Sequence, residues 1–127
     1  MAGGRKAPPP RALPPFVSHV LDLLAPLGPV VARAMFGGWG LSLDGKTFAL
    51  IAGDELYFKV DDGNRPAYLA RGRLPFAPYP DQPHRTMGYY PPPPEALEET
   101  DSLLPWARDA LAVAGRAALA KIKPRRG

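Results

Sequence analysis

Apolar residues recur at helical spacing near both ends of the chain and alternate with polar residues in between. In residues 13–28 an apolar stripe with steps of three and four residues is formed by Val17, Val20, Leu21 and Leu24. Pro14 and Pro15 suit the first turn of a helix, where no backbone N–H is needed, and Pro26 and Gly28 end the pattern. These residues predict an N-terminal helix.

A longer stripe in residues 100–122 predicts a C-terminal helix. Its members are Leu103, Leu104, Ala107, Leu111, Ala114, Ala118 and Ile122. A short helix is also predicted in residues 61–72, because Asn64 can cap its start, Pro66 falls in its first turn and Gly72 can end it. The chain therefore carries three candidate helices.

The pattern after the first helix is that of β-strands. Apolar and β-branched residues gather in residues 30–36, 39–43, 46–52 and 55–60. Asp44-Gly45 is a strong signal for a two-residue hairpin, and Gly53-Asp54 turns the chain again. Leu56, Phe58 and Val60 alternate with polar residues, as in a strand with one buried face. These segments predict an antiparallel meander of three strands or slightly more.

Two short strands are predicted in residues 75–80 and 86–91, so the order is helix, three strands, helix, two strands, helix. This order indicates the α+β class, in two layers, with an antiparallel sheet covered by helices on one face. The other face must be polar or covered by a partner. Aromatic side chains suited to such an interface are Trp39, Tyr57, Tyr89 and Tyr90.

Three glycines within four residues, Gly37, Gly38 and Gly40, form the most unusual stretch of the chain. A phosphate-binding loop needs a glycine pattern that opens a helix, and here a hairpin strand follows. Glycine in a strand pattern instead marks a bulge, a positive φ angle or a close approach of two backbones. The sequence favours this structural interpretation.

No residue combination typical of catalysis or of cofactor or metal binding stands out, so we expect no enzyme and no cofactor. None of the serines lies in a nucleophile motif, and Asp61 and Asp62 are neighbours that point to opposite faces of a strand. Arg33 and Lys59 are charges within apolar strands. We expect Arg33 to pair with an acid such as Asp61, Lys59 to face solvent, and Arg65 to pair locally.

Length and composition limit the alternatives. The 127 residues have the size of one domain, and the absence of cysteine excludes disulfides and thiolate chemistry. No apolar run reaches the ~20 residues of a membrane span or resembles a signal peptide, so we expect a cytoplasmic protein without membrane contact. We expect residues 1–12 to be a disordered basic and Pro-rich tail, residues 13–120 the domain, and residues 121–127 a second basic tail.

The positive charge of the chain is concentrated at its ends. The net charge is +4, of which the two ends contribute +7 and the middle −3. The cations that can contact phosphates are Arg5, Lys6, Arg11, Lys121, Lys123, Arg125 and Arg126. Such tails either add weak, salt-sensitive contacts to nucleic acid or simply keep the protein in solution.

Several blocks of the sequence together resemble the N-terminal domain of the TfoX/Sxy family of bacterial competence regulators. The blocks are RAMFGGWGLSLDGKTFALI, ELYFKVDDGNRPAYLARGRLPF, MGYYPPP and LLPWARDAL, and they span about residues 33–114. The positions that carry the resemblance are Arg33, Met35, Phe36, Gly37, Gly38, Gly40, Asp44, Gly45, Lys59, Asp61, Asn64 and Arg65.

The resemblance implies a fold like that of secretion chaperones and a dimer-forming domain without established catalytic activity. It also implies a role in transcription control of DNA uptake, although the chain stops where the regulators continue into a second domain. The leading hypothesis is a non-enzymatic domain that forms a homodimer and binds an unidentified protein partner. The alternatives are a nucleic-acid accessory protein that uses the basic tails, and a small-ligand binder or enzyme that uses the Gly37–Gly40 loop with Arg33 and Lys59.

Overall fold

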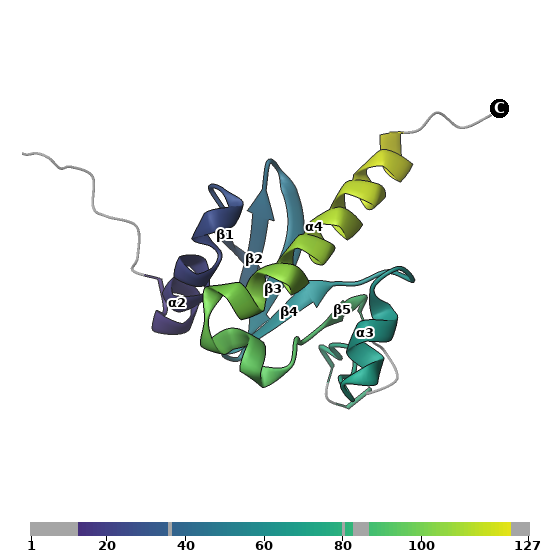
Figure 1. Cartoon of the computed structure of the whole chain (residues 1–127), viewed down its shortest axis with the longest axis horizontal. Helices are drawn as coiled ribbons and strands as arrows, with labels where there is room; N and C mark the ends of the chain where they lie inside the picture. Colours follow the sequence, from purple (N-terminus) through teal and green to yellow (C-terminus); the bar gives the residue numbers. More distant parts are fainter. Residues whose placement is uncertain (1–12, 36, 80, 83–86, 123–127) are drawn as a thin grey trace, which may run out of the picture.

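The computed structural model describes residues 13–35, 37–79, 81–82 and 87–122, which form one sheet with helices packed against it (Figure 1). The helices are α2 (Pro15–Leu23), α3 (Arg65–Ala70) and α4 (Thr100–Ile122), with short 3₁₀ turns η1 (Ala25–Leu27) and η2 (Pro94–Glu98). The strands are β1 (Val31–Met35), β2 (Gly38–Leu43), β3 (Lys46–Ala52), β4 (Glu55–Lys59) and β5 (Tyr89–Tyr90). The predicted α+β class is confirmed.

The five strands are antiparallel and lie in the sheet in the order of the sequence. Both predicted tight turns are present. Asp44 and Gly45 have φ angles of 52° and 77°, and Gly53 and Asp54 have φ angles of 56° and 59°. Positive φ at both central residues is the turn geometry that matches the twist of a hairpin.

The predicted order of elements is not confirmed, because four strands precede α3 and one follows it. The two segments on either side of Gly37 form separate strands, since this glycine has a φ of +78° and reverses the chain between β1 and β2. Residues 75–79 form no strand, although the Phe76 N–H donates to the Tyr89 carbonyl at 2.8 Å. Pro75 and Pro78 lack the N–H groups that would extend this pairing.

A β-bulge in β3 breaks the regular alternation of buried and exposed residues. Leu41 faces Ala49 and Ser42 faces Thr47, so Phe48 is an extra residue on its strand. Both Phe48 and Ala49 are fully buried as a result. The Phe48 ring stacks on Phe58 of β4 with 6.3 Å between ring centroids.

The core lies between one face of the sheet and the helices. Helix α4 crosses this face over β3 and β4, and its C-terminal end extends past the strands (Figure 1). Helix α4 buries Leu103 and Leu104 near its start, whereas further along it Ala107 and Ala110 are fully buried, so there the helix backbone can approach the sheet closely. Helix α2 adds Val17 and Val20 to the same core, and Leu24, the residue after the helix, is buried with them.

The buried ring of Tyr68 joins α3 to the core. It lies 5.6 Å from the Tyr90 ring and 4.8 Å from the Trp106 ring of α4. In the part of the chain that the structure describes, no helix is both long and apolar enough to cross a membrane.

Candidate functional site

A different steric constraint explains each of the three glycines in the Gly37–Gly40 loop. Gly37 has a positive φ. A Cβ on Gly38 would lie 2.2 Å from the carbonyl oxygen of Ile51 in β3, and a Cβ on Gly40 would lie 2.3 Å from the sulfur of Met35. The loop therefore lets two backbones and one methionine side chain pack closely, which supports the structural interpretation.

Of the other two members of the predicted ligand site, Arg33 lies opposite Gly40 in the sheet, but Lys59 does not meet it at this loop. Arg33 lies on β1 and Lys59 on β4, with two strands between them. Three inter-strand spacings amount to about 14 Å. Phe36 lies outside the described residues. The described residues also hold no group of three or more His, Asp or Glu side chains that could bind a metal ion.

Asp61 anchors the loop between β4 and α3 to helix α4. Its carboxylate accepts two hydrogen bonds from Arg116, at 2.8 and 2.9 Å, and a third from the Gly63 N–H at 2.9 Å. The hydrogen bond from Arg116 is the main reason why the pKa of Asp61 lies below its ordinary value. The predicted ion pair of Asp61 with Arg33 is wrong, because Arg33 lies on the far edge strand of the sheet.

Asn64 and Arg65 complete this loop. The Asn64 side chain accepts a hydrogen bond from the Asp61 N–H at 2.9 Å and donates one to the Lys59 carbonyl at 3.2 Å. It makes no capping hydrogen bond to α3, so that prediction was wrong. Arg65 pairs with Asp62 three residues earlier, which confirms the predicted local ion pair. The motif around Asp61 thus organises the backbone.

Two of the four aromatic residues predicted for an interface lie on the sheet face away from the helices. Tyr57 contacts Phe76 with 4.5 Å between ring centroids, and Lys59 lies 5.2 Å from the centre of the Tyr89 ring. The pKa of Tyr57 and that of Tyr89 are raised, mainly by burial. We call this side of the sheet the outer face.

The other two aromatic residues lie on the helix side. Tyr90 is buried against Tyr68, and Trp39 is half-buried and packs against the core. Neighbouring residues of a strand point to opposite faces, so Tyr89 and Tyr90 cannot share one surface. Neither Tyr90 nor Trp39 fits the exposed interface position that the sequence suggested.

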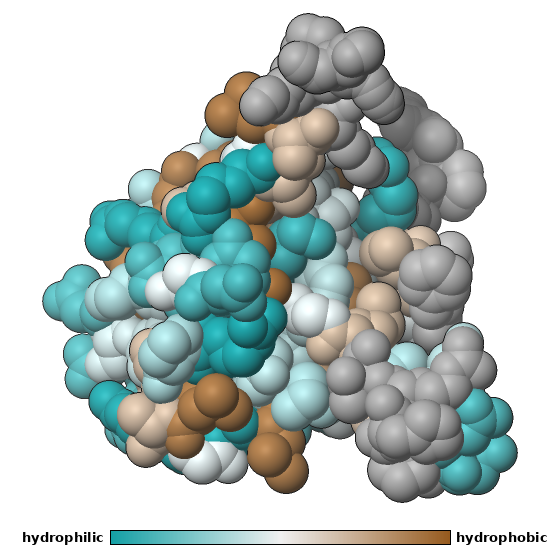
Figure 2. Space-filling view, turned by 90° about the vertical axis from the view of Figure 1, so that its right-hand side faces the viewer, coloured by the Kyte–Doolittle hydropathy of each residue, from teal (hydrophilic) through white to brown (hydrophobic). Residues whose placement is uncertain are grey.

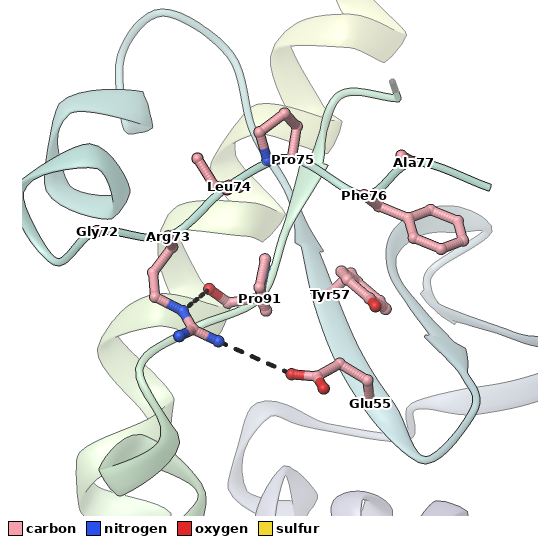
Figure 3. A pocket seen from close by; sticks show the side chains of 9 residues that line it. All are labelled: Glu55, Tyr57, Gly72, Arg73, Leu74, Pro75, Phe76, Ala77 and Pro91. Atoms are coloured by element: carbon pink, nitrogen blue, oxygen red, sulfur yellow. Dashed lines mark hydrogen bonds and ion pairs between the residues drawn. The ribbon is translucent and has the colours of Figure 1, made fainter. Parts of the chain in front are cut away.

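A hollow opens where the outer face meets the segment after α3 (Figure 3). Its volume is about 350 Å³. It is lined by Glu55, Tyr57, Gly72, Arg73, Leu74, Pro75, Phe76, Ala77 and Pro91. Sequence reasoning missed this hollow, because its walls come from three segments that only the fold brings together.

The exposed apolar residues are spread over the surface. Figure 2 shows mostly hydrophilic residues among those it colours, with hydrophobic residues in separate patches. Large apolar side chains that are exposed are Val31, Leu69, Leu74, Tyr79, Met87 and Leu119. Of these six, Leu74 lines the hollow.

The basic tails lie mostly outside the described residues. This applies to Arg5, Lys6, Arg11, Lys123, Arg125 and Arg126. Lys121 belongs to the last turn of α4. Their predicted contacts with phosphates stay a prediction.

Comparison with known families matches residues 22–114 to the TfoX N-terminal domain. The chain belongs to the TfoX N-terminal domain family. The match begins within α2 and ends within α4, so it includes the whole sheet. Arg116, the partner of Asp61, lies two residues beyond the matched part of this TfoX N-terminal domain. No curated protein matches the chain.

Proposed function

We propose that this TfoX N-terminal domain is a non-enzymatic module that forms a homodimer and binds a protein partner in the control of transcription or competence. The observation that carries the proposal is the uncovered edge of the sheet at β1. This strand pairs with β2 through all five of its residues, and no other described strand pairs with its second side. Unpaired backbone N–H and C=O groups on an edge can pair with another strand.

Of the usual features that protect an edge from pairing, β1 carries only one, the charge of Arg33. It contains no proline, and the bulge of this sheet lies elsewhere, in β3. Val31 is 49% exposed, and Ala34 is exposed as well. Two antiparallel β1 strands related by a twofold axis would join two sheets into one, which is a self-complementary interface. A register centred on Arg33 would place two like charges opposite each other, so pairing centred on Ala32 or Ala34 is favoured.

The molar mass in solution tests the dimer. Light scattering after size-exclusion chromatography should give twice the mass of the chain for the wild type. Ala34→Lys should give a monomer, because a charge on an edge strand opposes strand pairing. Ala112→Lys, the same change at an exposed alanine on α4, should leave the dimer intact. A monomeric wild type at high concentration would refute the proposal.

The charge distribution favours one second candidate, an accessory protein that binds nucleic acid through its tails. Seven basic residues and no acidic residue lie in residues 1–15 and 121–127 together. Titration of fluorescent duplex DNA and RNA should then show binding by the intact chain and none by residues 13–120. Affinity should fall by orders of magnitude between ~50 and ~200 mM salt if several phosphates are contacted. Equal binding by both chains would exclude the tails as the contact.

A further inference from the structure

The hollow beside the outer face has the size of a small-molecule site. Its volume of about 350 Å³ falls near the lower end of the range of about 300–1,000 Å³ found for ligand pockets. One wall is the strand β4, a second is the segment 72–77, and Pro91 closes the side between them. Figure 3 shows Arg73 and Glu55 at one end, and the rings of Tyr57 and Phe76 at the other.

Arg73 gives the hollow a cation with spare hydrogen-bonding capacity. Its Nε donates to the Pro91 carbonyl at 3.3 Å, which fixes the plane of the guanidinium group. Its Nη2 lies 3.8 Å from Glu55 Oε2, too far for a hydrogen bond. Within the described part of the chain the Arg73 side chain makes no further hydrogen bond or ion pair. The terminal N–H groups of a guanidinium match the two oxygens of a carboxylate.

The remaining walls suit an apolar body. Tyr57 and Phe76 meet with 4.5 Å between ring centroids and an angle of 39° between their planes, which leaves a tilted aromatic surface. Pro75 and Leu74 form the rim, and the Leu74 side chain is 72% exposed. A large exposed leucine beside an aromatic surface gains free energy when a ligand covers it.

Glu55 is the competitor for Arg73. Its side chain is 45% exposed, so it can turn into solvent at little cost when another carboxylate approaches. The Arg73 side chain is only 25% exposed, and partial burial strengthens its attraction to an anion. Glu55 is therefore the side chain that can move away, whereas Arg73 is held in place.

We propose that this hollow binds a small organic carboxylate with an aromatic or apolar body. The carboxylate pairs with Arg73 in place of Glu55, and the body lies against Tyr57 and Phe76. The same chemistry occurs in a free acid and in the C-terminal residue of a polypeptide. The proposal is independent of the dimer proposed above, since it uses neither β1 nor its edge.

The test is an NMR titration of the full chain, labelled with ¹⁵N, with four probes. The probes are 3-phenylpropanoate, its neutral amide, the cation 3-phenylpropylamine, and N-acetyl-L-phenylalanine as the mimic of a chain end. The two acids should shift the amide signals of Tyr57, Arg73 and Phe76. The acid should bind about tenfold more tightly than the amide, as expected when a hydrogen-bonded charge pair is gained.

Three variants test which residues cause the preference for the acid over the amide. Arg73→Gln should remove the preference for the acid over the amide, and Glu55→Gln should strengthen binding of the acid by up to about fivefold, the range of an exposed ion pair. Arg71→Gln is the matched control. Arg71 pairs with Glu95 at 2.9 Å and does not line the hollow, so its loss should leave binding unchanged.

Each outcome bears on the proposal. Absence of shifts at the hollow, equal affinity for acid and amide, or tighter binding of the amine would overturn it. If Arg73→Gln fails to fold, the comparison of the probes on the wild type still decides. Tighter binding of N-acetyl-L-phenylalanine than of 3-phenylpropanoate would identify a chain end as the ligand, and the reverse order would identify a free acid.

Discussion

Removal of the Tyr68 hydroxyl should stabilise the protein. This side chain is fully buried, and its hydroxyl has no hydrogen-bond partner among the described residues. A buried hydroxyl without a partner costs about 1–3 kcal/mol. Tyr68→Phe keeps the ring and its contacts with Tyr90 and Trp106. We expect the free energy of unfolding to rise by about 1 kcal/mol, which corresponds to an increase of about 3–5 °C in Tm.

The pH dependence of the same variant gives a second measurement. Burial, with a smaller effect of the Asp109 charge, raises the pKa of Tyr68 above its ordinary value. An unfolded tyrosine ionises near pH 10, whereas the folded one stays protonated. Below about pH 10 the tyrosine is protonated in both states, so its ionisation does not affect the free energy of unfolding. Above that pH only the unfolded tyrosine loses its proton, so the free energy of unfolding of the wild type falls as the pH rises towards the higher folded pKa. The advantage of Tyr68→Phe over the wild type should widen between about pH 9 and 11.

Urea unfolding followed by tryptophan fluorescence measures both effects, because Trp106 lies against the Tyr68 ring. Tyr57→Phe is the control, since the half-buried Tyr57 should change stability by less than about 0.5 kcal/mol. A loss of 1 kcal/mol or more in Tyr68→Phe at neutral pH would refute the reasoning. It would mean that the hydroxyl has a partner that stabilises the fold.

Two further predictions concern the residues that carry the family resemblance. The pKa of Asp61 is lowered, chiefly by the hydrogen bond from Arg116. The ionised carboxylate therefore stabilises the folded protein fully above the ordinary pKa of aspartate, and this stabilisation is lost as the pH falls through the lower folded pKa. Asp61→Asn should therefore unfold in urea with a weaker pH dependence between about pH 2 and 5 than the wild type, and an unchanged dependence would contradict the ion pair. Gly38→Ala should destabilise the protein by about 1–3 kcal/mol or more, because its Cβ would meet the Ile51 carbonyl in the sheet. A Cβ on Gly45 meets nothing within 4 Å, so Gly45→Ala is strained only by its positive φ. Thermal unfolding should therefore show a smaller decrease in Tm for Gly45→Ala than for Gly38→Ala.

Local signals were predictable because the residues that produce them are neighbours in the chain. Asp44-Gly45 and Gly53-Asp54 form tight turns in any sheet, since both residue types tolerate a positive φ. The end of α3 before Gly72 depends on the same property. These positions mark the end of β2, both ends of β3, the start of β4 and the end of α3.

The features that escaped prediction depend on distant residues. Arg116 reaches Asp61 across 55 positions of sequence, and no local pattern connects them. The bulge at Phe48 hides the alternation of β3, so its run of buried residues resembles a strand with two buried faces. The hollow requires β4, the segment after α3 and Pro91 together.

The roles of the recognisable residues also bear on where specific function lies. Gly38, Gly40, Asp61 and Asn64 belong to the signature, and each has a steric or hydrogen-bonding reason within the fold. These four residues of the signature therefore maintain backbone geometry. Those residues leave little capacity for contact with a ligand, since their polar groups are already paired within the domain. The proposed recognition of a small carboxylate uses a group outside those four residues, since the Arg73 side chain makes a single hydrogen bond in a hollow beside the exposed Leu74.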